Sequence, residues 1–234
     1  RFRSPLVAGP PDRFTVDGNR IERSTGLRRN PGNEAFLEIR EGEEWVTIDK
    51  ATVDTLSYSC LFETEDWKTG KDVPYRIVFP FTENGEKKSA TWEGIVRKEP
   101  KEKEVKLAAM SCLGNLGFPH RHLTTSIEQH DPDVLFFAGD QIYEGNDGFG
   151  TVIAENEPEV KRAMLNYLPK WWMFGWTYRN LLKDRPAVMT VDDHDLFQND
   201  YWGKGGEKMG ENRCFGGYLQ PVTWINAVEH TQMG

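Results

Sequence analysis

Three short segments of this sequence carry side chains that suit metal binding. Each segment follows an apolar run, and together they contain Cys112, Asp140, Tyr143, Asp193 and His194. Thiolate and phenolate groups are strong anionic donors for an oxidised iron, while an imidazole can serve as a ligand or as an acid. A carboxylate can bridge two metals, and two neighbouring metals lower the pKa of a bridging water and hold the oxygens of a phosphoryl group. The residue types therefore indicate metal-assisted hydrolysis.

These segments can meet because the apolar runs before them are expected to be parallel strands. We predict strands at residues 105–110, 134–138 and 187–191, with helical segments at 121–129 and 158–182 between them. Strands that alternate with helices form a parallel sheet with right-handed crossovers, so their carboxyl ends lie at one edge. Open α/β sheets bind ligands at that edge, and side chains that are distant in sequence can converge there.

The long helical segment contains Pro169, Gly175 and the aromatic run 171–176. A proline removes a backbone hydrogen bond from a helix, so we expect a break near Pro169 or Gly175. The aromatic run is expected to be buried against the sheet. An aromatic platform for a sugar or lipid substrate is the alternative interpretation of this run.

Residues 34 to 98 show the alternation of apolar and polar residues that is typical of half-buried strands. Hairpin turn signals separate the apolar runs, most clearly at Asn84 and Gly85. One of the strands is expected over residues 56–62. Short strands with hairpin turns and no helical period favour a small antiparallel β-sandwich of the immunoglobulin or fibronectin type.

Changes in composition divide the chain into four parts. Residues 1–33 are rich in Pro, Gly and Arg and are expected to form an extended arm. The β-sandwich domain follows over residues 34–98, and the charged run around Pro100 marks a linker at residues 99–104. Residues 105–234 are then expected to be the N-terminal part of an α/β catalytic domain. Its C-terminal part is expected to be missing, because a usual α/β domain is longer.

The composition also argues against some partners. A net charge of −8 disfavours nucleic acid and anionic membranes, because proteins that bind phosphate backbones usually carry a basic face. No apolar run reaches the length of a membrane span. Three cysteines at scattered spacings do not make a disulfide framework. The start at Arg1, without Met or a signal-type segment, indicates a mature or trimmed product, and nothing in the sequence indicates the oligomeric state.

The strand-end segments resemble a known family of enzymes. Residues 139–143 match the Gly-Asp-x-x-Tyr block of binuclear metallophosphoesterases of the purple acid phosphatase type, and residues 192–195 stand where that superfamily has Gly-Asn-His-Asp/Glu. With Ser111 and Cys112 at the first strand, the three motifs resemble the PhoD-like alkaline phosphatase/phosphodiesterase family. That family carries a small β-sandwich ahead of an αββα catalytic sandwich, and the resemblance covers roughly residues 34 to 234.

The resemblance implies a role for each matching residue. Cys112 and Tyr143 would ligate a ferric ion (Fe3+), and Asp140 would bridge it to a second metal, which is Ca2+ in known members. Asp193 would ligate the second metal or hold the phosphate. His194 would be the general acid toward the leaving oxygen or a contact to the phosphate.

The comparison with the family also concerns two asparagines and the later histidine motifs. Asn115 and Asn199 are weaker candidates for hydrogen bonds to the substrate. The superfamily's later His-containing blocks have no counterpart, since His230 is the only histidine after His194. We therefore expect the chain to be truncated after the third metal-site motif, and such a piece would lack some of the metal ligands.

The expected function is hydrolysis of phosphodiesters and/or phosphomonoesters by a metal-activated hydroxide, with a small-molecule phosphate ester as the substrate. The resemblance implies a PhoD-like alkaline phosphatase or phosphodiesterase that is secreted or periplasmic. Two alternatives stay open. The chain can be an inactive fragment or a non-catalytic binding or scaffolding protein that retains relic site residues, or the same fold can hydrolyse another ester, such as a phospholipid or a sulfate.

Overall fold

The computed structural model describes residues 33–233, apart from residues 66, 68–69, 102–103, 115–117, 146–149 and 199–217. Before residue 33 it describes the backbone of four short strands. These strands are β1 (Phe2–Ser4), β2 (Phe14–Asp17), β3 (Arg20–Arg23) and β4 (Arg29–Pro31). Within the described residues, no helix combines the length and apolar character needed to cross a membrane.

An antiparallel sheet is formed by most of the N-terminal strands. Its long strands are β5 (Glu34–Glu41), β6 (Glu44–Thr52), β8 (Val73–Glu83) and β9 (Glu86–Val96). The order is β4-β8-β5-β6, and β9 also pairs with β8. Alternate side chains of β5 and β8 enter a buried cluster, as the period of two predicts. The cluster comprises Ala35, Leu37, Cys60, Phe62, Tyr75, Ile77 and Phe79.

The expected antiparallel strands are thus present, but one of them is shorter than predicted. β7 spans Cys60–Phe62 and pairs with β1, whereas the alternation suggested a strand from residue 56. The Asp54 carboxylate accepts hydrogen bonds from the backbone N–H groups of Leu56 and Ser57, which makes a turn there. The β-sandwich assignment and the domain boundaries around residues 99–104 stay predictions.

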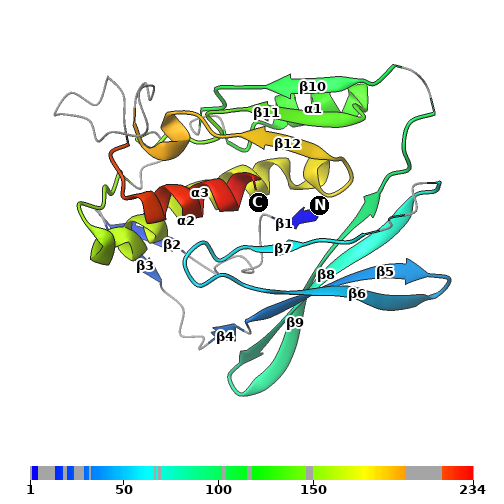
Figure 1. Ribbon diagram of the computed structural model, residues 1–234, viewed down its shortest axis with the longest axis horizontal. Helices are drawn as coiled ribbons and strands as arrows, with labels where there is room; N and C mark the ends of the chain where they lie inside the picture. The colour runs from blue at the N-terminus through cyan, green and yellow to red at the C-terminus, as the bar shows by residue number, and fades with distance from the viewer. Residues whose placement is uncertain are drawn as a thin grey trace.

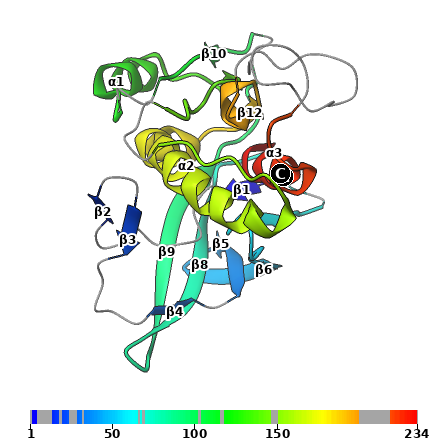
Figure 2. The ribbon, with the colours of Figure 1, turned by 90° about the vertical axis from the view of Figure 1, so that its left-hand side faces the viewer.

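A parallel sheet with helices follows, as the alternating pattern predicts. The strands are β10 (Leu107–Met110), β11 (Val134–Ala138) and β12 (Ala187–Thr190), and the helices are α1 (Arg121–His130), α2 (Val160–Leu182) and α3 (Val222–Met233). The strand order is β10-β11-β12, with all pairs parallel. Helices α2 and α3 lie between this sheet and the antiparallel strands in both views of the ribbon (Figure 1, Figure 2).

Helix α2 is unbroken over its 23 residues, so the expected interruption near Pro169 or Gly175 is wrong. Pro169 lies inside the helix and forgoes one backbone hydrogen bond, yet packing holds the helix on both sides of it. Phe174 is fully buried, and its ring contacts Phe137 of β11 at a centroid distance of 5.1 Å. Trp176 is 40% exposed, so the aromatic run is buried on one side only.

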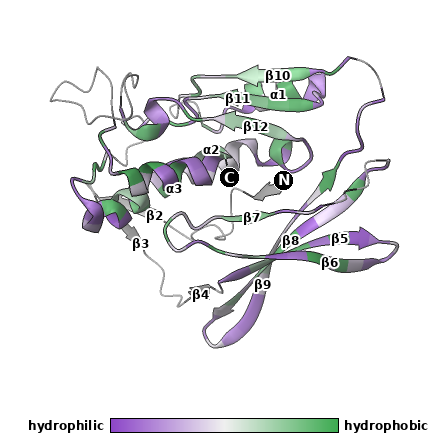
Figure 3. Ribbon diagram, in the orientation of Figure 1, coloured by the Kyte–Doolittle hydropathy of each residue, from purple (hydrophilic) through white to green (hydrophobic). Residues whose placement is uncertain are grey.

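The two sheets differ in hydropathy in the way that their types predict. The strands of the parallel sheet are mainly apolar, whereas β5, β6 and β9 carry many hydrophilic residues (Figure 3). Parallel strands are commonly covered on both faces, while antiparallel strands often leave one face in water. Leu135 and Phe137 of β11 are fully buried and face the core that α2 completes. The apolar strands of this sheet position the polar segments that follow them.

The antiparallel sheet and the α/β part meet at the turn after α2. The Tyr75 hydroxyl donates to the carbonyl oxygen of Lys183 at 2.9 Å, and the backbone N–H of Ile95 donates to the Asp184 carboxylate at 3.0 Å. Gly94 lies in this contact, where an added Cβ would be 2.2 Å from the Lys183 carbonyl oxygen and 2.8 Å from the Tyr75 ring. Only glycine allows the strand to approach the turn this closely.

The variant Gly94→Ala is therefore expected to lower the free energy of unfolding by about 1–3 kcal/mol, because its methyl group overlaps backbone that must shift. Urea unfolding followed by circular dichroism measures the change. Gly70→Ala is the matched control, since a Cβ there meets nothing within 4 Å. Equal midpoints for the two variants would contradict the close contact.

Candidate metal centre

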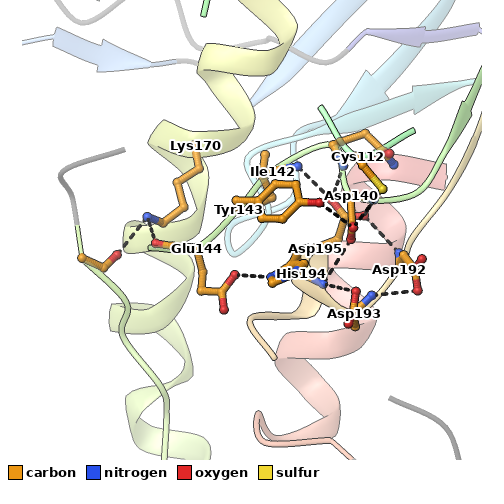
Figure 4. A network of polar contacts seen from close by, with 12 residues as sticks. Cys112, Asp140, Ile142, Tyr143, Glu144, Lys170, Asp192, Asp193, His194 and Asp195 are labelled. Carbon is orange, nitrogen blue, oxygen red and sulfur yellow. Dashed lines mark hydrogen bonds and ion pairs between the residues drawn. The ribbon is translucent and has the colours of Figure 1, made fainter. Parts of the chain in front are cut away.

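Asp140 lies at the centre of the site, two residues beyond the end of β11. The preceding Gly139 has a φ of +90°, and a Cβ there would be 2.5 Å from the Cβ of Asp192, so glycine lets the two strand-end segments touch. The Asp140 side chain accepts hydrogen bonds from Tyr143 Oη at 3.0 Å and Cys112 Sγ at 3.6 Å through Oδ2 (Figure 4). Burial raises the pKa of this carboxyl, and the hydrogen bond from Tyr143 partly offsets the rise.

Cys112 reaches Asp140 because the backbone continues the parallel pairing beyond β10. Its N–H donates to the Gly139 carbonyl at 3.3 Å, and the N–H of Leu113 donates to the Asp140 carbonyl at 3.0 Å. Cys112 itself has a φ of +57°, which turns the chain at the sheet edge. The residue as a whole is exposed, while its Sγ makes the contact with Asp140.

The rings of Tyr143 and His194 lie against each other beside Asp140. The ring centroids are 4.2 Å apart, with an interplanar angle of 31°. The imidazole Nδ1 is 2.9 Å from Oε2 of Glu144, and this hydrogen bond is the largest cause of a raised pKa at His194. Burial, followed by the contacts with Cys112 and Asp140, raises the pKa of the Tyr143 phenol.

Asp193 brings a second carboxylate to Asp140. One ligand atom from each of Asp140, Asp193 and His194 lies within 4.8 Å of the others, an arrangement that could hold a metal ion. The negative charge of Asp193 further raises the pKa of Asp140, and that of Asp192 does so to a smaller extent. Carboxylates this close repel one another, and a bound cation would relieve the repulsion.

Asp195 supports the site from the protein interior, and it was not assigned a role from the sequence. Its fully buried carboxylate accepts from the backbone N–H groups of Asp140 and Asp192 at 2.8 and 3.0 Å. It also accepts from the N–H groups of Gln141 and Ile142 at 3.0 and 3.2 Å. The side-chain amide of Gln232, in α3, is a further donor at 3.1 Å. One carboxylate thus joins two strand-end segments and a helix.

Burial raises the pKa of Asp195 to about 7, and its hydrogen bonds act in the opposite direction. The donors are four backbone N–H groups and one amide, and all of them match an ionised acceptor. A signal for this role was present in the sequence. Asp195 completes the polar run after β12, and a short polar side chain there commonly binds nearby N–H groups.

The structure brings Cys112, Asp140, Tyr143, Asp193 and His194 together, as the parallel sheet predicts. Their assignments as ligands, acid or phosphate contacts stay predictions. Asn115 and Asn199, the two candidates for substrate binding, lie outside the described residues. Sequence reasoning missed Glu144, although it follows Tyr143 directly in the same segment.

No protein-family model matches the sequence, and a search of curated proteins finds no significant match. A search of solved structures matches a structure of PhoD with a TM-score of 0.54 and 18% sequence identity. The match covers 83% of this chain but 38% of the PhoD chain, so this chain spans well under half the length of its structural relative. At this identity the match concerns the fold alone. The chain has a PhoD-like fold.

Proposed function

We propose that the protein is a metal-dependent phosphoesterase that hydrolyses phosphodiesters and/or phosphomonoesters. The observation that carries the proposal is the meeting of three strand-end segments, which bring Cys112, Asp140, Tyr143, Asp193 and His194 to one edge of the parallel sheet. The PhoD-like fold supports the same class of reaction. The family resemblance further supports a PhoD-like alkaline phosphatase or phosphodiesterase that is secreted or periplasmic.

The residues present fit a pair of metal ions. The Tyr143 hydroxyl and the Cys112 thiol both contact Oδ2 of Asp140, and a thiolate, a phenolate and a carboxylate together suit oxidised iron. The carboxylates of Asp140 and Asp193 suit a calcium ion, which prefers oxygen ligands. When bound, two such ions supply an activated water as nucleophile and neutralise the charge of the phosphoryl group.

His194 is placed to manage the proton of the leaving oxygen. Its Nδ1 is bonded to Glu144, which leaves Nε2 as the nitrogen that can face a substrate. The carboxylate favours the imidazolium form, which is the form that can donate a proton when the ester bond breaks. Tyr143 stacks on the ring and restricts its orientation.

The variant Glu144→Gln is expected to move the alkaline limb of the kcat profile to lower pH. The hydrogen bond from Glu144 is the largest cause of the raised pKa at His194, so losing the negative charge lowers that pKa. The imidazolium that serves as the acid is then lost at a lower pH. A pH–rate profile with 4-nitrophenyl phosphate measures the shift. Glu128→Gln, an exposed change on α1, is the control and should leave the limb in place.

The function itself is tested by assaying 4-nitrophenyl phosphate, bis(4-nitrophenyl) phosphate and 4-nitrophenyl sulfate side by side. Turnover of either phosphate, together with bound iron and a visible tyrosinate charge-transfer band, is the expected result. Preferred turnover of the sulfate would favour the alternative esterase. A colourless, iron-free protein without turnover would favour a non-catalytic role and overturn the proposal.

A further inference from the structure

A buried lysine lies beside the candidate metal centre. Lys170, in the middle of α2, has 0% exposure, and its Nζ donates to the carbonyl oxygens of Glu144 and Gly150 at 2.8 Å each (Figure 4). The ammonium is also 5.6 Å from the ring centroid of Phe197, which follows the short 3-10 helix η3 (His194–Leu196). A buried ammonium is costly unless it is well bonded, and most other buried positions of α2, such as Phe174, are apolar, although Asn166 and Thr177 are buried as well.

Both carbonyl groups belong to the segment between β11 and α2, of which residues 146–149 lie outside the described part of the chain. Asn166, one turn before Lys170 on the same helix, contacts this segment as well. Its side-chain amide donates to the Gly150 carbonyl at 3.3 Å and accepts from the Val152 N–H at 3.1 Å. Two buried polar residues spaced by four positions therefore face one segment of backbone.

The contact with Glu144 has a direct consequence for His194. The Glu144 carbonyl is held by Lys170, while the carboxylate of the same residue reaches Nδ1 of His194 at 2.9 Å. Fixing the backbone of Glu144 fixes the point from which its side chain extends. Groups that hydrogen-bond an imidazole, as Glu144 does here, fix its orientation. Changing such groups commonly lowers activity about tenfold to a hundredfold.

We propose that Lys170 is a positioning residue, which anchors the backbone of Glu144 so that its carboxylate holds the His194 imidazole in one orientation. The kinetic part of this inference rests on the proposed phosphoesterase function. A purely structural lysine would stabilise the protein without any special link to Glu144, and a double-mutant cycle separates the two roles.

The cycle compares Lys170→Met, Glu144→Ala and the double variant. Lys170→Met alone is expected to lower kcat about tenfold to a hundredfold, with a smaller change in KM. In the Glu144→Ala background the same change should have less than about a twofold effect, since the side chain that Lys170 places is gone. Met164→Ala, another buried change on α2, is the control, and its effect should be the same in both backgrounds. If the double variant instead lost kcat by the product of the two single effects, Lys170 and Glu144 would act independently and the proposal would be overturned.

A second measurement does not depend on catalysis. The Nδ1 proton of His194, bonded to a carboxylate, should give a downfield proton NMR signal that disappears in His194→Gln. We expect Lys170→Met to remove or shift this signal and Met164→Ala to retain it. A signal unchanged by Lys170→Met would overturn the positioning role even in an inactive protein, whereas absent turnover with a responsive signal would overturn only the phosphoesterase function.

A milder variant at the same position tests whether the effects of Lys170→Met result from misfolding. Lys170→Gln keeps a donor group, so it should fold where Lys170→Met does not, and it is tested in the same cycle. Failure of both variants to fold, under conditions in which Met164→Ala folds, would show that Lys170 is needed for the structure as a whole. That outcome also overturns a specific positioning role.

Discussion

Asp140→Asn is expected to abolish hydrolysis, with a loss of about a thousandfold or more in kcat/KM. The Asp140 side chain contacts Cys112, Tyr143 and the backbone of His194 at the same time. An amide keeps the shape of the carboxylate but loses its charge and one of its two acceptor oxygens, so it cannot bridge two cations. Removing a single hydrogen-bond donor that stabilises charge in an active site already costs about a hundredfold to a thousandfold.

The effect is measured as kcat/KM on 4-nitrophenyl phosphate and as iron bound per protein. Both values should fall together, because the proposed function gives the same carboxylate a role in metal binding and in the reaction. Asp133→Asn is the matched control, since Asp133 lies just before β11, at the end opposite Asp140, and its carboxylate accepts a hydrogen bond from the Lys106 N–H. Full activity in Asp140→Asn would contradict a bridging role and, with it, the metal centre.

The convergence at this sheet edge could be predicted because it depends on local patterns and one geometric rule. The run from Val134 to Ala138 is apolar and short, and it is bounded by Pro132 and Gly139, so it reads as a buried strand. Parallel strands then place their ends together, whatever the distance along the chain. The same reasoning gave the strands that lead to Cys112 and Asp193.

The supporting contacts could not be predicted, because they join residues with no fixed spacing in the sequence. Glu144 and His194 are 50 positions apart, and Gln141 and Gln232 are 91 positions apart. Lys170 lies within an amphipathic helical pattern, where a lysine is ordinarily placed on the solvent side. Its burial depends on the path of the segment near Gly150, which the sequence does not specify.

Charge is distributed unevenly between the site and its support. Carboxylate oxygens of Asp140 and Asp193 lie close together, and the charge of Asp193 raises the pKa of Asp140, so this proximity is unfavourable unless a cation is bound. Asp195, by contrast, accepts hydrogen bonds from several N–H groups, which offset part of the cost of its burial. Under the proposed function, Asp140 and Asp193 would therefore serve a bound cation, while Asp195 serves the structure that holds them.

Because Asp195 has a structural role, Asp195→Ala is expected to destabilise the protein as well as to inactivate it. The change leaves four backbone N–H groups and the Gln232 amide without their shared acceptor in a buried place. Each buried donor that loses its partner costs about 1–3 kcal/mol, and local relaxation recovers part of the sum. We expect a loss of about 3–5 kcal/mol in the free energy of unfolding, measured by urea denaturation.

Asp195→Asn tests whether geometry or charge matters more at this position. Its single carbonyl oxygen can still accept from two N–H groups, so the loss of stability should be roughly half of that for Asp195→Ala. Asp133→Ala removes one exposed acceptor and should change stability by less than about 1 kcal/mol. If Asp195→Ala were no worse than Asp133→Ala, the segments after β11 and β12 would have to be held by other contacts. Loss of activity in that variant would then be attributable to the site itself.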